Sequence, residues 1–263
     1  MRIASRSEAA LQTLALLRRL KQTVERGEAR LQFVLQRKRR ALPLSGEQVQ
    51  KYNRDGYLLV SGLIPENIVG GAVAAMWLSV GADTQAQETW AILGPHPLVL
   101  QDKRLVATYT DSMVAAAAQL AGEHVASFRQ PTRVFTVNNL PVSRNWQAHQ
   151  PHLDGTRAEL RHRTFPRPYR IGALSYLTDV QRHGGGTIVW PGSHLKVEAL
   201  ARAEPRKYKY LSALSSDLDR VSLGPPVELT PSGGDVLFHH YLCVHASSDN
   251  VSGAPRLAIL HKW

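Results

Sequence analysis

The second half of the chain alternates short β-rich runs with turns that contain glycine and proline, and this pattern restricts the fold more than any other feature. The runs cover residues 133–138, 169–178, 186–190, 227–229, 235–239 and 256–262. Many short strands with this punctuation are typical of a sandwich or a barrel. No internal repeat and no alternation of strands with helices competes with this interpretation. We therefore expect a mainly β fold with a jelly-roll, cupin-like core.

Helical patterns are confined to the first half of the chain. Ser45 and Gln48 have the spacing of a capping box, in which each side chain accepts a hydrogen bond from the other residue's backbone. An apolar run at 57–60 predicts a strand directly after Gly56. We expect three helices, running from Ser45 through Tyr52, from Pro65 to about Trp77, and from an Asp111 cap to Gly122. These helices would flank the β core on one side.

The positive charge of the chain is concentrated at its N-terminus. The formal net charge is +11, and residues 1–42 contribute +8 of it through 11 Lys and Arg against three Glu. Leucine and valine recur in this segment at steps of three, four and seven, which predicts a basic amphipathic helix. We expect a helical extension over 1–42 and one domain over 43–263. That domain carries too little net charge to indicate a nucleic-acid partner.

Three roles are open for the basic helix. Its apolar stripe could pack on the domain or on a second copy of the chain as a dimer interface, with the charges solvated. It could instead make a peripheral contact with an anionic membrane surface. The third alternative is an organelle-targeting presequence, which the arginines favour and which Glu8, Glu25 and Glu28 oppose.

Cysteine usage fits a reducing compartment or a fold that needs no disulfides. Cys243 is the single cysteine, so the chain forms no intramolecular disulfide. No apolar run approaches the roughly 18 residues needed to cross a membrane, and the N-terminus lacks the apolar core of a secretory signal. We expect a cytoplasmic protein without a transmembrane segment.

Three side chains have the pattern of a metal site. His152 and Asp154 lie two positions apart, so on an extended strand they point to the same face. His245, far downstream, would supply the third ligand. Two histidines and one carboxylate that leave three coordination positions open form the facial arrangement of non-haem Fe(II) oxygenases. An isolated His-x-Asp triplet also fits a loop carboxylate beside a surface histidine, so the surrounding segments decide between the two.

The segments around these residues follow a specific order. Gly185–His194 is a strand bracketed by glycines that ends in a Pro-Gly turn, residues Gly234–Phe238 read Gly-Asp-Val-Leu-Phe, and Arg256 follows His245 by 11 positions. In this order they are similar to the phytanoyl-CoA hydroxylase-like (phytanoyl-CoA dioxygenase) family of Fe(II)/2-oxoglutarate-dependent dioxygenases. The resemblance covers most of the expected domain.

The sequence departs from the family pattern in three places. Gly184 stands where the family often has Asn, and Pro151–Asp154 replaces a commoner Trp-His-Gln-Asp. An arginine-rich stretch follows the first two candidate ligands. Details of the family's substrate pocket are therefore not carried over to this chain.

The resemblance implies a double-stranded β-helix and an enzyme that uses Fe(II), 2-oxoglutarate and O2. Such an enzyme hydroxylates a C–H bond of a small or acylated organic substrate while 2-oxoglutarate and O2 become succinate and CO2. Arg256 would grip the far carboxylate of 2-oxoglutarate with its planar fork. Ser247, by resemblance, and Asn139 are further candidates for binding the cosubstrate, although Asn139 could also be a turn residue before Pro141. Because halogenating relatives replace the metal-binding carboxylate with a small residue, Asp154 indicates hydroxylation.

Several arginines follow the first two candidate ligands. Arg157, Arg161 and Arg163 lie on a loop that would overhang the pocket mouth. They could bind the phosphate, carboxylate or coenzyme A thioester of an anionic small-molecule substrate. A solvated charged loop is the alternative interpretation.

Two other classes of function are compatible with the sequence. One is a non-catalytic jelly-roll binding or scaffold protein that works through its basic N-terminal helix. The other is a cupin-like enzyme that uses Zn or Mn without 2-oxoglutarate, in which Arg256 would have no catalytic importance.

Overall fold

The computed structural model describes residues 43–94 and 96–263, so the basic helix expected over 1–42 lies outside the described residues. Two antiparallel sheets form the core. The larger sheet has six strands in the order β1-β7-β4-β9-β3-β2, and the smaller has three in the order β6-β5-β8. The bounds of the strands are β1 Tyr57–Val60, β2 Val99–Leu100, β3 Val134–Thr136, β4 Gly172–Tyr176, β5 Ile188–Val189, β6 Val227–Glu228, β7 Val236–His239, β8 His245–Ala246 and β9 Ala258–Lys262.

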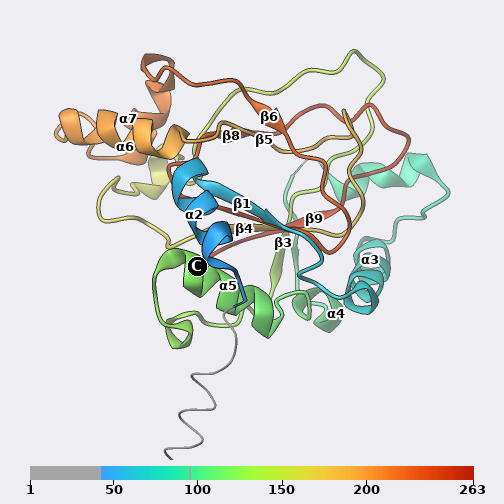
Figure 1. Ribbon diagram of the computed structural model, residues 1–263. Helices are drawn as coiled ribbons and strands as arrows, with labels where there is room; N and C mark the ends of the chain where they lie inside the picture. Colours follow the sequence, from blue (N-terminus) through green and yellow to red (C-terminus); the bar gives the residue numbers. More distant parts are fainter. Residues whose placement is uncertain (1–42, 95) are drawn as a thin grey trace, which may run out of the picture. The chain divides into compact units, whose positions relative to one another are not determined.

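Helices cover the outer face of the larger sheet, and the smaller sheet faces its inner side (Figure 1). The α-helices are α2 Gly46–Asp55, α3 Glu66–Val80, α4 Lys103–Val106, α5 Asp111–Ala121, α6 Ser193–Ala203 and α7 Leu211–Ser216. Short 3-10 turns cover Gln87–Leu93, Val125–Ser127, Ala158–Leu160 and Leu218–Arg220. None of the helices within residues 43–94 and 96–263 is long and apolar enough to cross a membrane. The expected mainly β fold with flanking helices is confirmed.

Alternation along the strands divides the core in two, because successive side chains point to opposite faces of a sheet. On β7, Val236 and Phe238 pack among the helices, whereas Leu237 belongs to the cluster between the sheets. On β9, Ile259 faces the helices and Ala258 faces the smaller sheet in the same way. The inner face of the larger sheet is therefore one wall of the space between the sheets.

The first helix begins and ends as its sequence predicts. The hydroxyl of Ser45 accepts a hydrogen bond from the backbone N–H of Gln48, and the Gln48 side chain accepts one from the Ser45 N–H. Gly56 ends the helix in the left-handed conformation, with φ of 79°. A Cβ at this position would lie 2.3 Å from Nδ1 of His194, so Gly56 is required by close packing as well as by its backbone.

Two helical features differ from the expectations. The cap of α5 is Thr110 rather than Asp111, because the Thr110 hydroxyl accepts a hydrogen bond from the N–H of Met113. Helices α6 and α7 lie in the half of the chain where only strands and turns were expected. In α6 the buried side chains are Ser193, His194, Val197 and Ala201. Because three of these four residues are small or polar, the sequence shows no apolar period of a helix here. These helices pack in a separate cluster with β5 and β8.

Candidate active site

Two histidines face each other across neighbouring chain segments at one end of the smaller sheet. The backbone of His152 pairs with that of β8: its N–H donates to the His245 carbonyl over 2.9 Å, and the His245 N–H donates back over 3.1 Å. Directly opposed residues of an antiparallel pair project to the same side. The two imidazole rings accordingly lie 4.6 Å apart between centroids.

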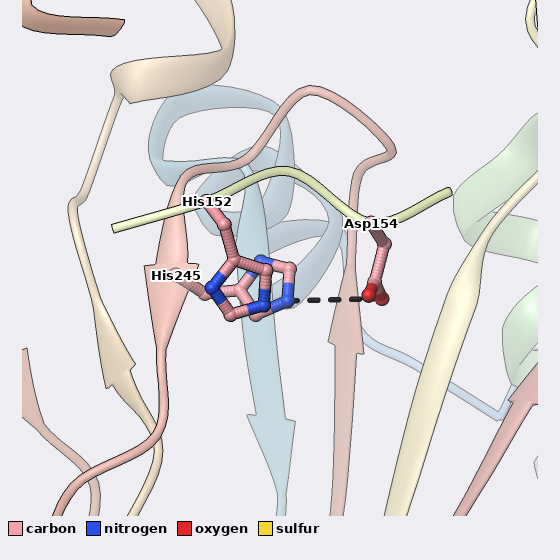
Figure 2. A group of neighbouring side chains, drawn as sticks. All are labelled: His152, Asp154 and His245. Carbon is pink, nitrogen blue, oxygen red and sulfur yellow. Dashed lines mark ion pairs between the residues drawn. The ribbon is translucent and has the colours of Figure 1, made fainter. Parts of the chain in front are cut away.

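Asp154 completes the group: it lies two positions beyond His152, at the start of a turn that continues through Gly155. Its Oδ2 is 3.7 Å from Nε2 of His245. One donor atom from each of His152, Asp154 and His245 lies within 4.8 Å of the others, a spacing that could hold a metal ion. Figure 2 shows the His152 ring and the Asp154 carboxylate on one segment of the chain and the His245 ring on another, with the three side chains converging.

The hydrogen bonds of the imidazoles fit metal ligation. Nδ1 of His152 lies 3.2 Å from the carbonyl of Gln150, and Nδ1 of His245 lies 3.0 Å from the carbonyl of Cys243. A carbonyl only accepts, so each Nδ1 carries the proton and each Nε2 keeps its lone pair. Burial and the nearby His245 lower the pKa of His152, which keeps that ring neutral at pH 7. The residues present therefore fit a bound divalent metal.

One cation and one neutral imidazole lie close to the Asp154 carboxylate. Nζ of Lys262 lies 3.1 Å from Oδ2 of Asp154, and Nε2 of His239 lies 3.8 Å from the same oxygen. Burial alone would raise the pKa of Asp154, but His245 and Lys262 lower it well below its usual range. The carboxylate is therefore ionised across the physiological pH range, as a metal ligand must be.

His239 supports the site from β7. Burial lowers the pKa of His239 to about 3, so its ring is neutral. It packs against the His245 ring at 5.0 Å between centroids. On β4, Gly172 pairs with His239, and a Cβ on Gly172 would lie only 2.2 Å from Nε2 of His239. The glycine thus makes room for an imidazole beside the candidate ligands.

Lys262 is the site residue that the sequence interpretation did not single out. Residues 256, 258, 260 and 262 share one face of an extended strand, so Lys262 lies on the same side as Arg256. This even spacing was a usable signal. Its strength was low because a lysine near the end of a strand is usually solvated.

A cavity of about 140 Å³ contains the candidate ligands and Arg256. Polar lining comes from His152, Asp154, Thr187, His239, His245, Ser247 and Arg256. Apolar lining comes from Val137, Leu174, Val189, Leu237, Ala246 and Leu260. The apolar walls belong to both sheets, so the cavity lies between them and is partly shielded from water.

Arg256 carries a buried charge without an acidic partner. It is 6% exposed, and its guanidinium donates to the carbonyls of Gly185 and Val137 over 2.9 and 2.6 Å. Its Nε has no hydrogen-bond partner, and no carboxylate among the described residues pairs with it. Burial lowers its pKa, yet guanidinium stays protonated in proteins. A buried cation of this kind is costly unless an anion binds beside it, so the cavity is complementary to a carboxylate.

Ser247 and Asn139 lie beside Arg256 in different ways. Ser247 lines the cavity. Asn139 is the cross-strand neighbour of Arg256, and its amide donates to the Ser248 carbonyl over 2.7 Å and to the Ser247 hydroxyl over 3.3 Å. Asn139 does not line the cavity, so its contact with the site runs through Ser247.

The structure does not bring the three loop arginines into this cavity. The side chain of Arg157 is 83% exposed and lies 3.8 Å from Glu159. The guanidinium of Arg161 lies over the Tyr210 ring at 5.9 Å, and Arg163 forms a backbone bridge with the same tyrosine. Their positions fit a solvated loop as well as a contact with a large ligand.

Two antiparallel sheets that enclose a two-histidine, one-carboxylate group define a class of protein, the double-stranded β-helix oxygenases that use non-haem iron. A family model described as phytanoyl-CoA dioxygenase matches residues 52–258. The chain therefore belongs to the phytanoyl-CoA dioxygenase family of iron- and 2-oxoglutarate-dependent oxygenases. A search of curated proteins finds no match.

Solved structures share the fold at low sequence identity. The alpha ketoglutarate dependent carbocyclase SnoK from nogalamycin biosynthesis is 21% identical, with 83% of this chain and 84% of that chain covered and a TM-score of 0.57. The epimerase SnoN, solved with Fe3+, alpha ketoglutarate and nogalamycin RO, is 21% identical, with 81% and 80% covered and a TM-score of 0.54. EctD from S. alaskensis, solved with 2-oxoglutarate and 5-hydroxyectoine, is 18% identical, with 84% and 77% covered and a TM-score of 0.52.

Proposed function

We propose that the protein is a hydroxylase that binds Fe(II) through His152, Asp154 and His245 and uses 2-oxoglutarate and O2. The observation that carries the proposal is the meeting of these three donors with the buried, unpaired charge of Arg256 in one small cavity. Family membership and the iron- and 2-oxoglutarate-bound structures of similar fold support it.

The proposed binding mode satisfies the charges of the cavity. The far carboxylate of 2-oxoglutarate pairs with Arg256 and accepts a hydrogen bond from Ser247, which Asn139 holds in place. Asp154 and Arg256 together balance the charges of the metal and the cosubstrate, and the partly exposed Lys262 adds one positive charge at the edge of the site. When bound, Fe(II) and 2-oxoglutarate supply the oxidising chemistry, with succinate and CO2 as coproducts.

The residues of the chain contribute coordination and shielding. The carbonyls of Gln150 and Cys243 fix the two imidazoles in the tautomer that offers Nε2 to the metal. The apolar walls on both sheets exclude water from the oxidising centre. Asp154 would hold the metal at the position where halogenating relatives have a small residue that makes room for chloride, so we propose hydroxylation of a C–H bond.

The proposed substrate is a small or acylated organic molecule that carries negative charge. Arg157, Arg161 and Arg163 remain candidates for contacts with its outer parts. We also propose a cytoplasmic location, because the chain has one cysteine and Cys243 is buried as a free thiol. For residues 1–42 we propose a basic extension that contacts a second copy of the chain or a membrane surface.

The experiment that tests this function is a metabolite-extract screen. Purified full-length protein is incubated with Fe(II), ascorbate and 2-oxoglutarate, and the products are searched by mass spectrometry for a gain of one oxygen. We expect succinate to form in equal amount with the oxygenated product. Replacing His152 with Ala should abolish both, whereas His124→Ala, an exposed histidine outside the cavity, should not. A protein that forms no succinate, with or without extract, contradicts the proposal.

A further inference from the structure

A second cavity of about 760 Å³ opens beside the last residues of β9, and we call it the cationic groove. Its lining includes four cationic side chains and two aromatic rings, which are Arg129, Arg133, Arg170, Lys262, Phe135 and Trp263. No acidic side chain of the described residues lines it. A concave surface with one sign of charge attracts ligands of the opposite sign.

The positive charges of the cationic groove are poorly compensated. Arg129 and Arg133 are exposed and form no ion pair with residues 43–94 and 96–263. Glu123, just outside the lining, shares its single carboxylate between Arg167 and Arg170. At least two guanidinium groups are therefore free to bind an anion.

Buried aromatic contacts hold the wall of the groove in place. The indole N–H of Trp263 donates to the carbonyl of Arg129 over 3.0 Å. The Trp263 ring also packs against Phe128 at 5.8 Å and Tyr109 at 6.3 Å between centroids. The guanidinium of Arg170 lies over the Phe128 ring at 5.6 Å. A binding surface held this way loses little entropy when a ligand binds.

Lys262 connects the cationic groove to the metal site. It lines the groove, and its Nζ lies 3.1 Å from Oδ2 of Asp154, which lines the active-site cavity. The active-site cavity holds about 140 Å³, whereas sites for small organic ligands usually hold roughly 300 Å³ or more. With 2-oxoglutarate bound there, most of the substrate has to lie outside it.

We propose that the cationic groove binds the anionic part of the substrate, which carries at least two negative charges as phosphate or carboxylate groups. Arg129 and Arg133 pair with these groups, and the half-exposed Phe135 contacts the adjoining apolar part. The inference rests on the proposed function for the reaction itself. According to this inference, Arg129 and Arg133 make the main contacts with the substrate's anionic groups, and Arg157, Arg161 and Arg163 do not.

The test uses full-length protein and inorganic pyrophosphate as the probe, measured by isothermal titration calorimetry without metal or 2-oxoglutarate. The groove variant combines Arg129→Gln and Arg133→Gln. The matched control combines Arg182→Gln and Arg206→Gln, which removes the same charge from exposed positions outside both the groove and the active-site cavity. Circular dichroism of each variant verifies that it is folded.

We expect the groove variant to bind pyrophosphate at least tenfold more weakly than the wild type, because each charge-assisted hydrogen bond contributes roughly a factor of ten. The control should change affinity less than twofold. Equal affinity in wild type and groove variant, as expected if residues 1–42 bind the probe, overturns the inference. A larger loss in the control than in the groove variant overturns it as well. Uncoupled succinate formation is measured in parallel. Its absence contradicts the proposed function, whereas the calorimetry tests anion binding in the groove independently of the reaction.

Discussion

Lys262 and Asp154 form an ion pair inside the candidate metal site, with 3.1 Å between Nζ and Oδ2. The lysine comes from the end of β9, and the aspartate comes from the segment that pairs with β8. Both side chains are mostly buried, at 28% and 17% exposure. A metal ion bound by Asp154 would share this carboxylate with Lys262, so the two cations have overlapping roles in balancing its charge.

Replacing Lys262 with Met should therefore make stability depend more strongly on the metal. Without metal, Asp154 loses its nearest cation, and we expect the free energy of unfolding to fall by about 1–2 kcal/mol, less than for a fully buried pair because Lys262 is partly exposed. Fe(II) replaces the lost charge. Thermal unfolding under anaerobic conditions should show a larger metal-induced rise in Tm in the variant than in the wild type. An equal metal-induced rise in Tm in the variant and the wild type would contradict the idea that Lys262 and the metal balance the same carboxylate charge.

Arg256 should determine the affinity for 2-oxoglutarate. Arg256→Met removes a charge-assisted, two-pronged contact, and we expect KM for 2-oxoglutarate to rise roughly 100-fold, which corresponds to about 3 kcal/mol. Arg256→Lys should give an intermediate value because ammonium cannot pair bidentately. Uncoupled succinate formation measures both. Arg182→Met, outside the active-site cavity, is the control. If neither change at Arg256 alters KM, Arg256 does not bind 2-oxoglutarate; if no protein forms succinate at all, the protein works without 2-oxoglutarate, as a Zn or Mn enzyme of this fold would.

Gly172 should tolerate no side chain. An added Cβ would meet the His239 ring at 2.2 Å, and both lie in paired strands that cannot separate easily. We expect Gly172→Ala to destabilise the protein by about 1–3 kcal/mol and to weaken metal binding by displacing His239 toward His245. Gly70→Ala is the control: Gly70 lies inside α3 with nothing within 4 Å of its Cβ, so the change should be neutral or stabilising. Urea unfolding curves that give the two variants equal stability would refute this packing argument.

His240 should make stability fall as the pH falls below 7. Burial, with a smaller contribution from the nearby His194, lowers the pKa of His240 to about 3, and its Nδ1 accepts a hydrogen bond from the Leu242 N–H. The unfolded chain protonates near pH 6.5, so between pH 7 and pH 5 it takes up a proton that the folded chain does not. This costs about 2 kcal/mol of stability at pH 5 relative to pH 7.

The asparagine variant of His240 keeps an acceptor in place of Nδ1 but does not titrate. Urea unfolding of metal-free protein at pH 5, 6 and 7 should show a pH dependence reduced by about 1.4 kcal/mol per pH unit at the acid end. Other buried histidines, such as His261, contribute the remaining slope in both proteins. If the variant and the wild type lose stability in parallel, His240 is not a buried neutral histidine.

The sequence predicted those parts of the structure that depend on local periodicity. The strand runs, the Ser45 capping box and the two-residue step from His152 to Asp154 are all local, and all appear in the structure. The pairing of His152 with His245 is a contact over 93 positions, and only the ordered motifs of a known family indicated it. Helix α6 went unpredicted because its buried face includes Ser193 and His194, which mask an apolar period.

Long-range charge pairing could not be predicted from the sequence. Glu123 binds Arg167 and Arg170 from 44 and 47 positions away, which separates these two arginines from Arg157, Arg161 and Arg163. The arginines between residues 157 and 170 therefore do not act as one cluster. Lys262 was overlooked for the same reason, since its partner Asp154 lies in a distant segment that no local pattern connects to β9.

The most direct test of the account is Fe(II) binding by equilibrium dialysis under anaerobic conditions. The account predicts one Fe(II) per wild-type chain, a large loss of affinity in His152→Ala, Asp154→Ala and His245→Ala, and wild-type affinity in His124→Ala. Tighter binding in the presence of 2-oxoglutarate should disappear in Arg256→Met. Stoichiometric binding that survives all three ligand substitutions, or no binding by the wild type, would contradict an iron site at these residues.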